Sequence, residues 1–328
     1  MGNVIYVGDA EAGLVRMKAD GVVASMCVTS PPYFGLRDYG VGGQIGLEDS
    51  PREYIGRLVG VFSRVWDVLA DDGTLWVNIG DSYAANRGYQ VPDGKVGNVG
   101  NSKGSKVPSG LKPKDLIGIP WMLAFALRDA GWYLRQEIIW SKPNPMPESV
   151  TDRCTKSHEQ IFLFSKRPRY YFDAEAIKED LADSSIGRAN RKQNLIDMAG
   201  VGTLGKQIDG GVDPLHGYAG LALARGGKTG YDLESGLRNK RSVWEVATKP
   251  YKGAHFACFP EDLITPCILA GCPAGGLVLD PFMGSGTTAI TAVQNGRRFA
   301  GCELNRSYVP LQMDRLGLFQ MDTEWVDV

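Results

Sequence analysis

Two short motifs, each placed directly after an apolar run, constrain most strongly how this chain can fold. Residues 29–33 read Thr-Ser-Pro-Pro-Tyr and follow the apolar run 22–28. Residues 280–288 read Asp-Pro-Phe-Met-Gly-Ser-Gly-Thr-Thr and follow the shorter run 277–279. Open α/β sheets place their ligands at the carboxyl ends of parallel strands, which is where such strand-then-loop motifs lie. A sheet that unites the two motifs must bring opposite ends of the chain to one edge.

The rest of the chain alternates between strand-like and helix-like patterns. Strands are expected at residues 3–8, 22–28, 74–79, 133–140, 160–164, 277–279 and 298–303, and helices at 9–18, 52–69, 120–130, 261–270 and 287–294. Segment 52–69 has apolar side chains at helical spacing and is expected to stop at Asp71-Asp72-Gly73. The alternation predicts an α/β fold whose mainly parallel sheet is covered by helices on both faces.

Length and composition narrow the class of protein. A chain of 328 residues can form one large α/β domain or a core domain with an insertion. It has no apolar run of about 18 residues and no signal-like N-terminus, so we expect a cytoplasmic protein without a membrane partner. The six scattered cysteines form no Cys-x-x-Cys pair and only three histidines are present. This pattern argues against a metal site and for reduced thiols.

Two segments depart from the α/β pattern. Residues 84–112 are rich in Gly, Asn, Ser and Lys and lack periodicity, so they are expected to form a long, mobile, basic loop. Residues 178–249 have frequent glycines and short apolar runs, which predicts an inserted module within a body formed by 1–177 and 250–328. Because the whole chain has a net charge of only −1, a locally basic segment suits contact with phosphates.

The C-terminal motif has the features of a nucleoside-binding loop. Gly284 and Gly286 allow the backbone to approach a ligand closely. The helix that begins near Thr287 directs its N–H groups and its positive end toward that ligand. Glu303 ends the next predicted strand about twenty residues later, where a carboxylate can accept two hydrogen bonds from ribose hydroxyls.

The N-terminal motif can hold a planar amine. Pro31 and Pro32 fix the backbone and remove two N–H donors, so that carbonyl groups face outward without competing donors. Such a carbonyl and the Ser30 hydroxyl can accept hydrogen bonds from an exocyclic amino group. Tyr33 can stack on a flat base. Together the two motifs predict an enzyme that brings a cofactor and a planar amine side by side.

Taken together, the motifs resemble those of the S-adenosylmethionine-dependent DNA amino-methyltransferases. The catalytic motif comes first and the cofactor motif last, which is the permuted order of the β class. Asp9 and segments 78–81 and 255–261 also resemble parts of that family. The resemblance covers about 250 residues and leaves out 84–112 and 178–249. It implies a Rossmann-like methyltransferase fold with 178–249 as a target-recognition region.

The resemblance also implies roles for individual residues. A base flipped out of duplex DNA would receive the methyl group directly, without a covalent intermediate or a catalytic cysteine. The implied catalytic residues are Ser30, Pro31, Pro32 and Tyr33. The implied cofactor-binding residues are Asp9, Thr29, Asp280, Phe282, Gly284, Ser285, Gly286, Thr287, Glu303 and Asn305. The candidate DNA-binding residues are Lys103, Lys106, Lys142, Arg188, Arg191, Lys192, Arg238, Lys240 and Arg241.

Several questions stay open at this point. Serine at the head of the catalytic motif favours N4 of cytosine as the methylated atom, with N6 of adenine as the alternative. A methyltransferase acting on RNA or on a protein amide is disfavoured by the motif order, and an inactive DNA-binding protein is disfavoured by the intact motifs. The expected partner is double-stranded DNA, and the expected source is a bacterium, an archaeon or a phage. A cognate restriction endonuclease and a homodimer are left open.

Overall fold

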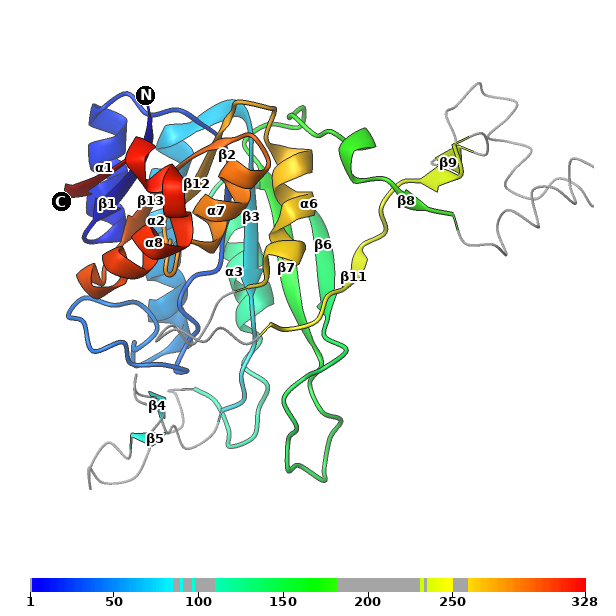
Figure 1. Cartoon of the computed structure of the whole chain (residues 1–328). Helices are drawn as coiled ribbons and strands as arrows, with labels where there is room; N and C mark the ends of the chain where they lie inside the picture. The colour runs from blue at the N-terminus through cyan, green and yellow to red at the C-terminus, as the bar shows by residue number, and fades with distance from the viewer. Residues whose placement is uncertain are drawn as a thin grey trace, which may run out of the picture. The chain divides into compact units, whose positions relative to one another are not determined.

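The computed structural model describes residues 2–84, 110–181, 235–249 and 259–328, together with the backbone of three two-residue strands at 89–90, 96–97 and 231–232 (Figure 1). The chain divides into two compact units. The larger unit comprises Met1–Asp173 and Ser242–Val328, and the smaller unit comprises Ala174–Arg241. Predicted segment 255–261 lies outside the described residues up to residue 258.

The larger unit is built on a nine-stranded sheet. Its strands are β1 (Asn3–Val7), β2 (Ala24–Thr29), β3 (Leu69–Ile79), β6 (Tyr133–Ser141), β7 (His158–Ser165), β11 (Val243–Glu245), β12 (Leu277–Asp280), β13 (Arg298–Glu303) and β14 (Thr323–Asp327). They lie in the order β11-β6-β7-β3-β2-β12-β13-β1-β14. All neighbouring strands run parallel except β7, which is antiparallel to both β3 and β6. The predicted mainly parallel sheet is therefore confirmed.

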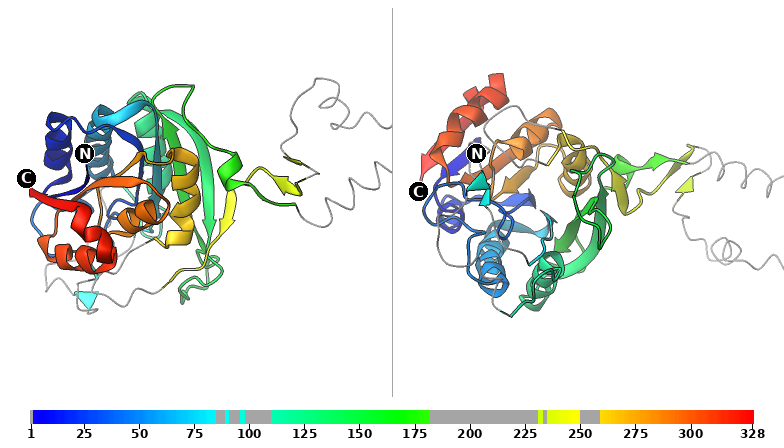
Figure 2. Two further views of the ribbon diagram at one scale, coloured as in Figure 1. Left: turned by 45° about the horizontal axis from the view of Figure 1, so that its top comes forward. Right: turned by 90° about the horizontal axis from the view of Figure 1, so that it is seen from below.

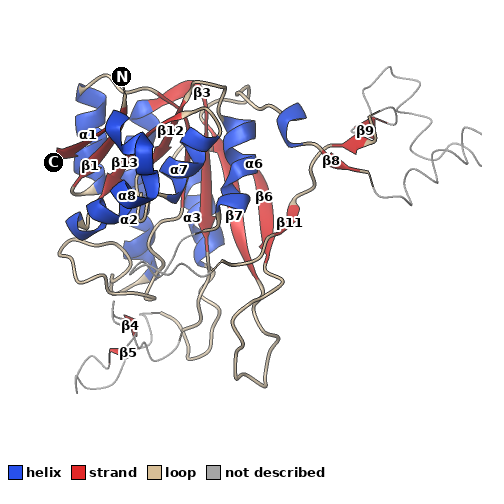
Figure 3. Cartoon of the chain, viewed as in Figure 1, coloured by secondary structure: helices blue, strands red, loops and turns tan. Residues whose placement is uncertain are grey.

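Helices cover both faces of this sheet, as the sequence predicts (Figures 2 and 3). One face carries α1 (Ala10–Ala19), α2 (Pro51–Val68) and α3 (Ile119–Asp129), and the other carries α6 (Glu261–Gly271), α7 (Thr287–Gln294) and α8 (Val309–Leu316). Three short 3₁₀ turns complete the described helices: η1 (Glu175–Ile177), η2 (Arg306–Tyr308) and η3 (Gly317–Asp322). No helix in the described parts of the chain is long and apolar enough to cross a membrane.

Helix α2 shows how local sequence sets an element's bounds. The Ser50 hydroxyl and the Glu53 side chain form a reciprocal capping box, and Pro51 occupies the first turn. The helix buries Tyr54 and Phe62 completely against the core. It ends at Val68, and β3 then begins at once, so the predicted turn at residues 71–73 and the predicted strand start at 74 are wrong. The pairing with β2 shows the reason: Ala24 lies opposite Leu69 and Met26 lies opposite Thr74, so residues 70–73 form a bulge in β3 and regular pairing resumes at Thr74.

The two ends of the described chain lie side by side in the sheet. Strand β1 pairs with β13 on one side and with β14 on the other, both in parallel. Neither β14, β11 nor α8 is predicted by the sequence patterns. Strand β11 pairs with β6 within the larger unit. Residues 242–249 therefore belong to the larger unit, and the smaller unit ends at Arg241, not at residue 249 as predicted for the insert.

The smaller unit is described only in part. Its strands β8 (Glu179–Asp180), β9 (Tyr231–Asp232) and β10 (Leu237–Arg238) form an antiparallel sheet in the order β8-β10-β9. Its role as a target-recognition region stays a prediction.

The predicted loop 84–112 lies largely outside the described residues. Two short antiparallel strands, β4 (Tyr89–Gln90) and β5 (Val96–Gly97), are described within it. The ends of the segment are held in place. Ala84 is buried and donates its N–H to the Asp115 carbonyl at 2.8 Å, and the Lys112 N–H donates to Asp115 Oδ2 at 2.9 Å.

Candidate active site

A cavity of about 870 Å³ opens at the edge of the sheet where the parallel strands end. Residues that follow β1, β2, β3, β6, β12 and β13 line it, and so does the beginning of the antiparallel strand β7. All four predicted catalytic residues line the cavity. Of the ten predicted cofactor residues, eight line it; the two that do not are Thr29 and Gly286. The topology thus brings the two distant motifs to one site.

A single carboxylate joins the catalytic motif to the cofactor motif. Asp280 Oδ1 accepts a hydrogen bond from Thr29 Oγ1 at 2.6 Å, and Asp280 Oδ2 accepts one from Thr288 Oγ1 at 2.5 Å. Burial raises the pKa of Asp280 to about 6, although these hydroxyls and the Phe282 N–H act to lower it. The Thr29 side chain is fully buried. Its hydroxyl therefore supports the site from behind, by holding Asp280, and does not face the cavity.

Glu303 is a buried carboxylate at the wall of the cavity. Its Oε2 accepts a hydrogen bond from the Gly284 N–H and its Oε1 accepts one from the Asn305 N–H, both at 2.7 Å. The side chain is 7% exposed, and burial raises its pKa to about 7. Gly284 and Gly286 have φ angles of +54° and +83°, a left-handed region in which a side chain is strained. The glycines of the motif are thus required by the turn that holds Glu303.

Two further polar groups face this part of the cavity. The Thr287 hydroxyl is buried and has no hydrogen-bond partner within the described residues, although Thr287 lines the cavity. A buried hydroxyl of this kind indicates that a bound molecule satisfies it. Asp9 also lines the cavity, and its carboxylate caps α1 by accepting the N–H groups of Glu11 and Ala12 at 2.9 and 3.1 Å.

The catalytic motif is held at two neighbouring residues, Pro32 and Tyr33. The Pro32 carbonyl accepts a hydrogen bond from the Tyr54 hydroxyl at 2.8 Å. The Tyr33 hydroxyl donates to Glu159 Oε2 at 2.6 Å and lies 3.3 Å from Asn78 Oδ1. Burial raises the pKa of Tyr33 well above its usual value, and the negative charge of Glu159 raises it further, while Ser30 acts in the opposite direction. Tyr33 is therefore a neutral phenol at physiological pH.

The sequence patterns do not identify two charged residues of this wall. Glu159 lies at the start of β7. The Lys156 ammonium group donates a hydrogen bond to the Asp81 carbonyl at 3.0 Å. Burial lowers the pKa of Lys156, while the charges of Asp81 and Glu159 oppose that change. The available signal was the pair His158-Glu159 directly before a predicted strand. It becomes meaningful only when that strand is known to be antiparallel, because its beginning then lies at the ligand edge.

The candidate DNA-binding residues differ in where they lie and in what they contact. Lys142 lines the cavity and forms an ion pair with Glu159. In the smaller unit, the carboxylate of Glu179 forms ion pairs with three of the candidates. The nitrogens of Arg238, Arg241 and Lys240 lie 3.0, 3.0 and 3.9 Å from its oxygens. The other candidates, Lys103, Lys106, Arg188, Arg191 and Lys192, lie outside the described residues. Their contacts with DNA stay predictions.

Comparison with known proteins decides the family. The sequence model of the N6- and N4-specific DNA methylases matches residues 24–314. The chain belongs to the DNA methylase family. This DNA methylase is 46% identical over 316 residues to the type II methyltransferase M.Cfr9I of Citrobacter freundii, covering 96% of this chain and 88% of that protein. It is 44% identical over 313 residues to M.SmaI of Serratia marcescens, covering 95% and 90%.

Solved structures share the fold of this DNA methylase. The cytosine-N4-specific PvuII DNA methyltransferase matches with a TM-score of 0.58 and 16% identity, covering 100% of this chain and 95% of that one. A DNA modification methylase of Thermus thermophilus, in complex with S-adenosyl-L-methionine, matches with a TM-score of 0.55 and 20% identity, covering 100% and 98%. The predicted Rossmann-like methyltransferase fold is confirmed.

The cofactor of this family is S-adenosylmethionine, and the cavity fits it. The Glu303 carboxylate has two oxygens at the wall and suits the paired hydroxyls of a ribose. The unpartnered Thr287 hydroxyl supplies a further buried polar contact. The glycine turn at Gly284 and Gly286 lets the backbone lie close to a ligand. The residues present therefore fit a nucleoside cofactor.

Proposed function

We propose that this DNA methylase transfers a methyl group to N4 of a cytosine flipped from duplex DNA into the cavity. The observation that carries this choice of base is Ser30, which stands at the head of the Ser-Pro-Pro-Tyr motif and lines the cavity. Serine at this position is typical of the N4-cytosine branch of the family, and aspartate is typical of the N6-adenine branch. N6 of adenine is the second candidate, because Ser and Asp both accept an amino hydrogen.

The side chains around the cavity form two groups, one for binding the cofactor and one for binding the base. S-adenosylmethionine supplies an electrophilic methyl group when it is bound. Glu303, Thr287 and Asp9 hold the nucleoside side of the cavity. The Ser30 hydroxyl and the Pro31 carbonyl accept the hydrogens of the exocyclic amino group and orient its lone pair. Tyr33 provides a flat surface for the base. Positioning and electrostatic complementarity then account for the rate, without a covalent intermediate.

Recognition of the DNA sequence is assigned to segment 178–241, and contact with the phosphates to segment 84–112 and Lys142. Arg and Asn side chains of the insert would read base edges in the major groove. The relatives are named type II methyltransferases, which supports a cognate restriction endonuclease as a partner of this protein in the cell. Sedimentation of the purified chain, alone and with DNA, would distinguish a monomer from a homodimer.

The proposal is tested by transfer of labelled methyl from S-adenosylmethionine to mixed-sequence duplex DNA, followed by mass spectrometry of the nucleosides. N4-methylcytosine is the expected product. N6-methyladenine would overturn the choice of base and keep the reaction. An absence of label in any DNA, with the cofactor bound normally, would overturn the proposed activity. Where a methylated base is found, sequencing of the modified DNA would map the recognition site for later assays.

A further inference from the structure

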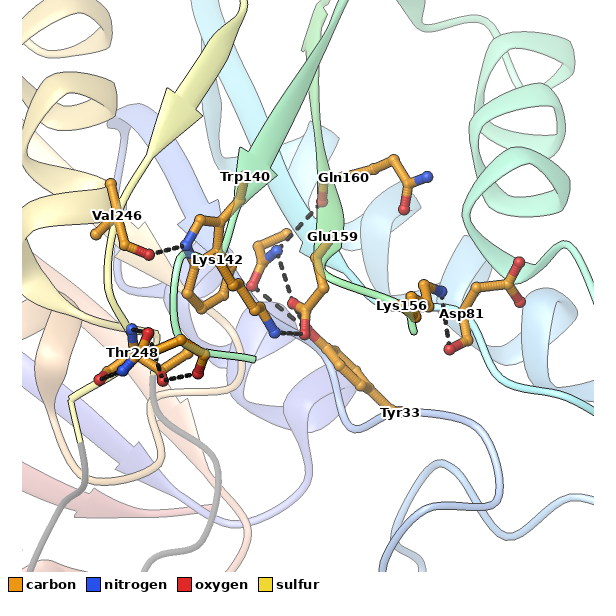
Figure 4. Close-up of polar contacts among 11 residues, drawn as sticks. Tyr33, Asp81, Trp140, Lys142, Lys156, Glu159, Gln160, Val246 and Thr248 are labelled. Atoms are coloured by element: carbon orange, nitrogen blue, oxygen red, sulfur yellow. Dashed lines mark hydrogen bonds and ion pairs between the residues drawn. The ribbon is translucent and has the colours of Figure 1, made fainter. Parts of the chain in front are cut away.

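Behind Tyr33 lies a chain of polar contacts that the motifs do not account for (Figure 4). Glu159 stands between Tyr33 and Lys142 and uses both carboxylate oxygens. Its Oε2 accepts hydrogen bonds from the Tyr33 hydroxyl at 2.6 Å and from Asn78 Nδ2 at 3.2 Å. Its Oε1 binds the Lys142 ammonium group. Since Asn78 also donates to the Gln160 carbonyl at 3.2 Å, the contacts continue into the backbone of β7.

Each partner of Glu159 is itself held in place. The Lys142 ammonium lies 4.3 Å from the centre of the Trp140 ring, and the Trp140 indole N–H donates to the Val246 carbonyl at 2.7 Å. The Lys142 N–H donates to the Ser157 carbonyl at 2.8 Å. The side chains of Lys142 and Glu159 are only 18% and 14% exposed. The ion pair is thus fixed by strands β6, β7 and β11 and is not a solvated surface pair.

The Tyr33 ring is positioned by contacts along its edge as well as by its hydroxyl. A Cβ added at Gly80 would lie 2.7 Å from Tyr33 Cε2, so the absence of a side chain at Gly80 makes room for the ring. The backbone of the catalytic motif is fixed separately, by the hydrogen bond from Tyr54 to the Pro32 carbonyl. The hydroxyl contact with Glu159 therefore fixes where the far end of the side chain lies, by restricting rotation about Cα–Cβ, while the close backbone at Gly80 limits rotation of the ring about Cβ–Cγ.

We propose that Glu159 is a positioning residue for methyl transfer: with the counter-charge of Lys142, it fixes the Tyr33 ring in the orientation that receives the target base. The inference rests on the proposed function, because it takes Tyr33 as the surface on which the base stacks. Glu159 touches neither the base nor the cofactor in this assignment and acts only through the Tyr33 hydroxyl.

The chemistry of the contact explains why a carboxylate is used. An ionised carboxylate only accepts hydrogen bonds, so it fixes the direction of the bond from the Tyr33 hydroxyl. A glutamine in its place could present its NH₂ group to Lys142, which sets a donor against a donor, or to Tyr33, where the phenol oxygen would have to accept and the direction of the hydrogen bond would reverse. The Lys142 ammonium compensates the charge that would otherwise be buried alone. The pair therefore gives the Tyr33 hydroxyl a charged acceptor at 2.6 Å, which is closer than the Asn78 Oδ1 acceptor at 3.3 Å.

The test is a double-mutant cycle between Tyr33→Phe and Glu159→Gln, measured as kcat and as KM for S-adenosylmethionine on a duplex that contains the mapped site. If Glu159 acts through the Tyr33 hydroxyl, each single variant lowers kcat by about 10- to 100-fold, and the double variant is no worse than either one. KM for the cofactor is unchanged in all three. Glu137→Gln, the same substitution on β6 at a residue that does not line the cavity, keeps wild-type kcat.

Three outcomes would count against the inference or against its basis. Losses in kcat that multiply in the double variant would overturn it, because Glu159 would then act independently of Tyr33. A Glu159→Gln variant with wild-type kcat would also overturn it. Tyr33→Ala distinguishes the two levels: wild-type transfer by that variant would refute the proposed base platform itself. If Glu159→Gln fails to fold, the combined Glu159→Gln and Lys142→Met variant, which removes both charges together, replaces it in the cycle, with kcat taken at saturating duplex because Lys142 is also assigned to phosphate contact.

Discussion

Replacing Glu303 by glutamine should change the pH dependence of stability in a direction that the structure fixes. Burial raises the pKa of this carboxyl from an ordinary 4.5 to about 7, against the lowering effect of the Asn305 and Gly284 N–H groups. A carboxyl with a raised pKa binds its proton more tightly in the folded state. Its contribution to stability is therefore fully present below pH 4.5 and is lost as the pH rises through about 7.

The magnitude follows from the same two pKa values. Each pH unit between them corresponds to about 1.4 kcal/mol, so ionised Glu303 lowers the free energy of unfolding by about 3 kcal/mol at pH 8. Glutamine removes this loss. Its amide oxygen can accept only one of the two N–H groups that Glu303 accepts, and the other then meets an NH₂ group at a cost of about 1–3 kcal/mol. The variant should therefore be up to about 2 kcal/mol more stable than the wild type at pH 8 and less stable at pH 5.

The assay is urea unfolding of the protein without cofactor between pH 5 and pH 8, with Glu137→Gln as the control for loss of one carboxylate outside the cavity. The wild-type decline in stability with pH should be reduced in the Glu303 variant, and a part should remain because Asp280 also has a raised pKa. An unchanged decline would refute the argument. Calorimetry should show cofactor affinity weaker by at least about tenfold, since hydrogen bonds to a charged group contribute about 1.5–3 kcal/mol each. Unchanged affinity would refute the ribose assignment.

Three further predictions concern the remaining parts of the site. Thr29→Val removes the 2.6 Å donor of Asp280 and should lower the free energy of unfolding at pH 8 by about 1.5–3 kcal/mol, with a smaller loss at pH 5; equal losses at both pH values would contradict it. Gly80→Ala places a Cβ 2.7 Å from the Tyr33 ring and should lower kcat without changing cofactor affinity, whereas Gly56→Ala, on an open face of α2, should leave both unchanged. Binding to unmethylated duplex DNA should fall steeply with salt concentration, and a flat response would argue against a phosphate clamp.

Much of the larger unit could be predicted because its signals are local. Helix α7 and strand β13 match their predicted residues 287–294 and 298–303, since a glycine turn precedes one and an apolar run forms the other. The two motifs also converge as predicted, because parallel strands end at one edge of a sheet. The place of Glu303 at the cavity could be predicted because it ends β13, the strand that follows the glycine turn and α7.

The rest depends on pairings that the sequence does not encode locally. Strand β14 is a short edge strand whose partner, β1, lies at the other end of the chain. The antiparallel direction of β7 decides that Glu159, and not a residue at the other end of that strand, reaches the cavity. The pairing of Lys142 with Glu159 then follows from the alignment of β6 with β7, where Ser141 lies opposite His158. The sequence suggested Lys142 as a DNA-binding residue. In the structure, its ammonium group also forms an ion pair with Glu159.

The order of the motifs along the chain matters less to the chemistry than the hydrogen bonds between them. Thr29 ends β2 and Asp280 ends β12, and these strands are neighbours in the sheet although the two residues are 251 positions apart. Thr288, in the first turn of α7, binds the same carboxylate. Asp280 therefore ties the cofactor loop to the end of β2, and Ser30 to Tyr33 follow directly after that strand. Because this link depends only on neighbouring strands, a permuted chain keeps it, provided that β2 and β12 remain adjacent.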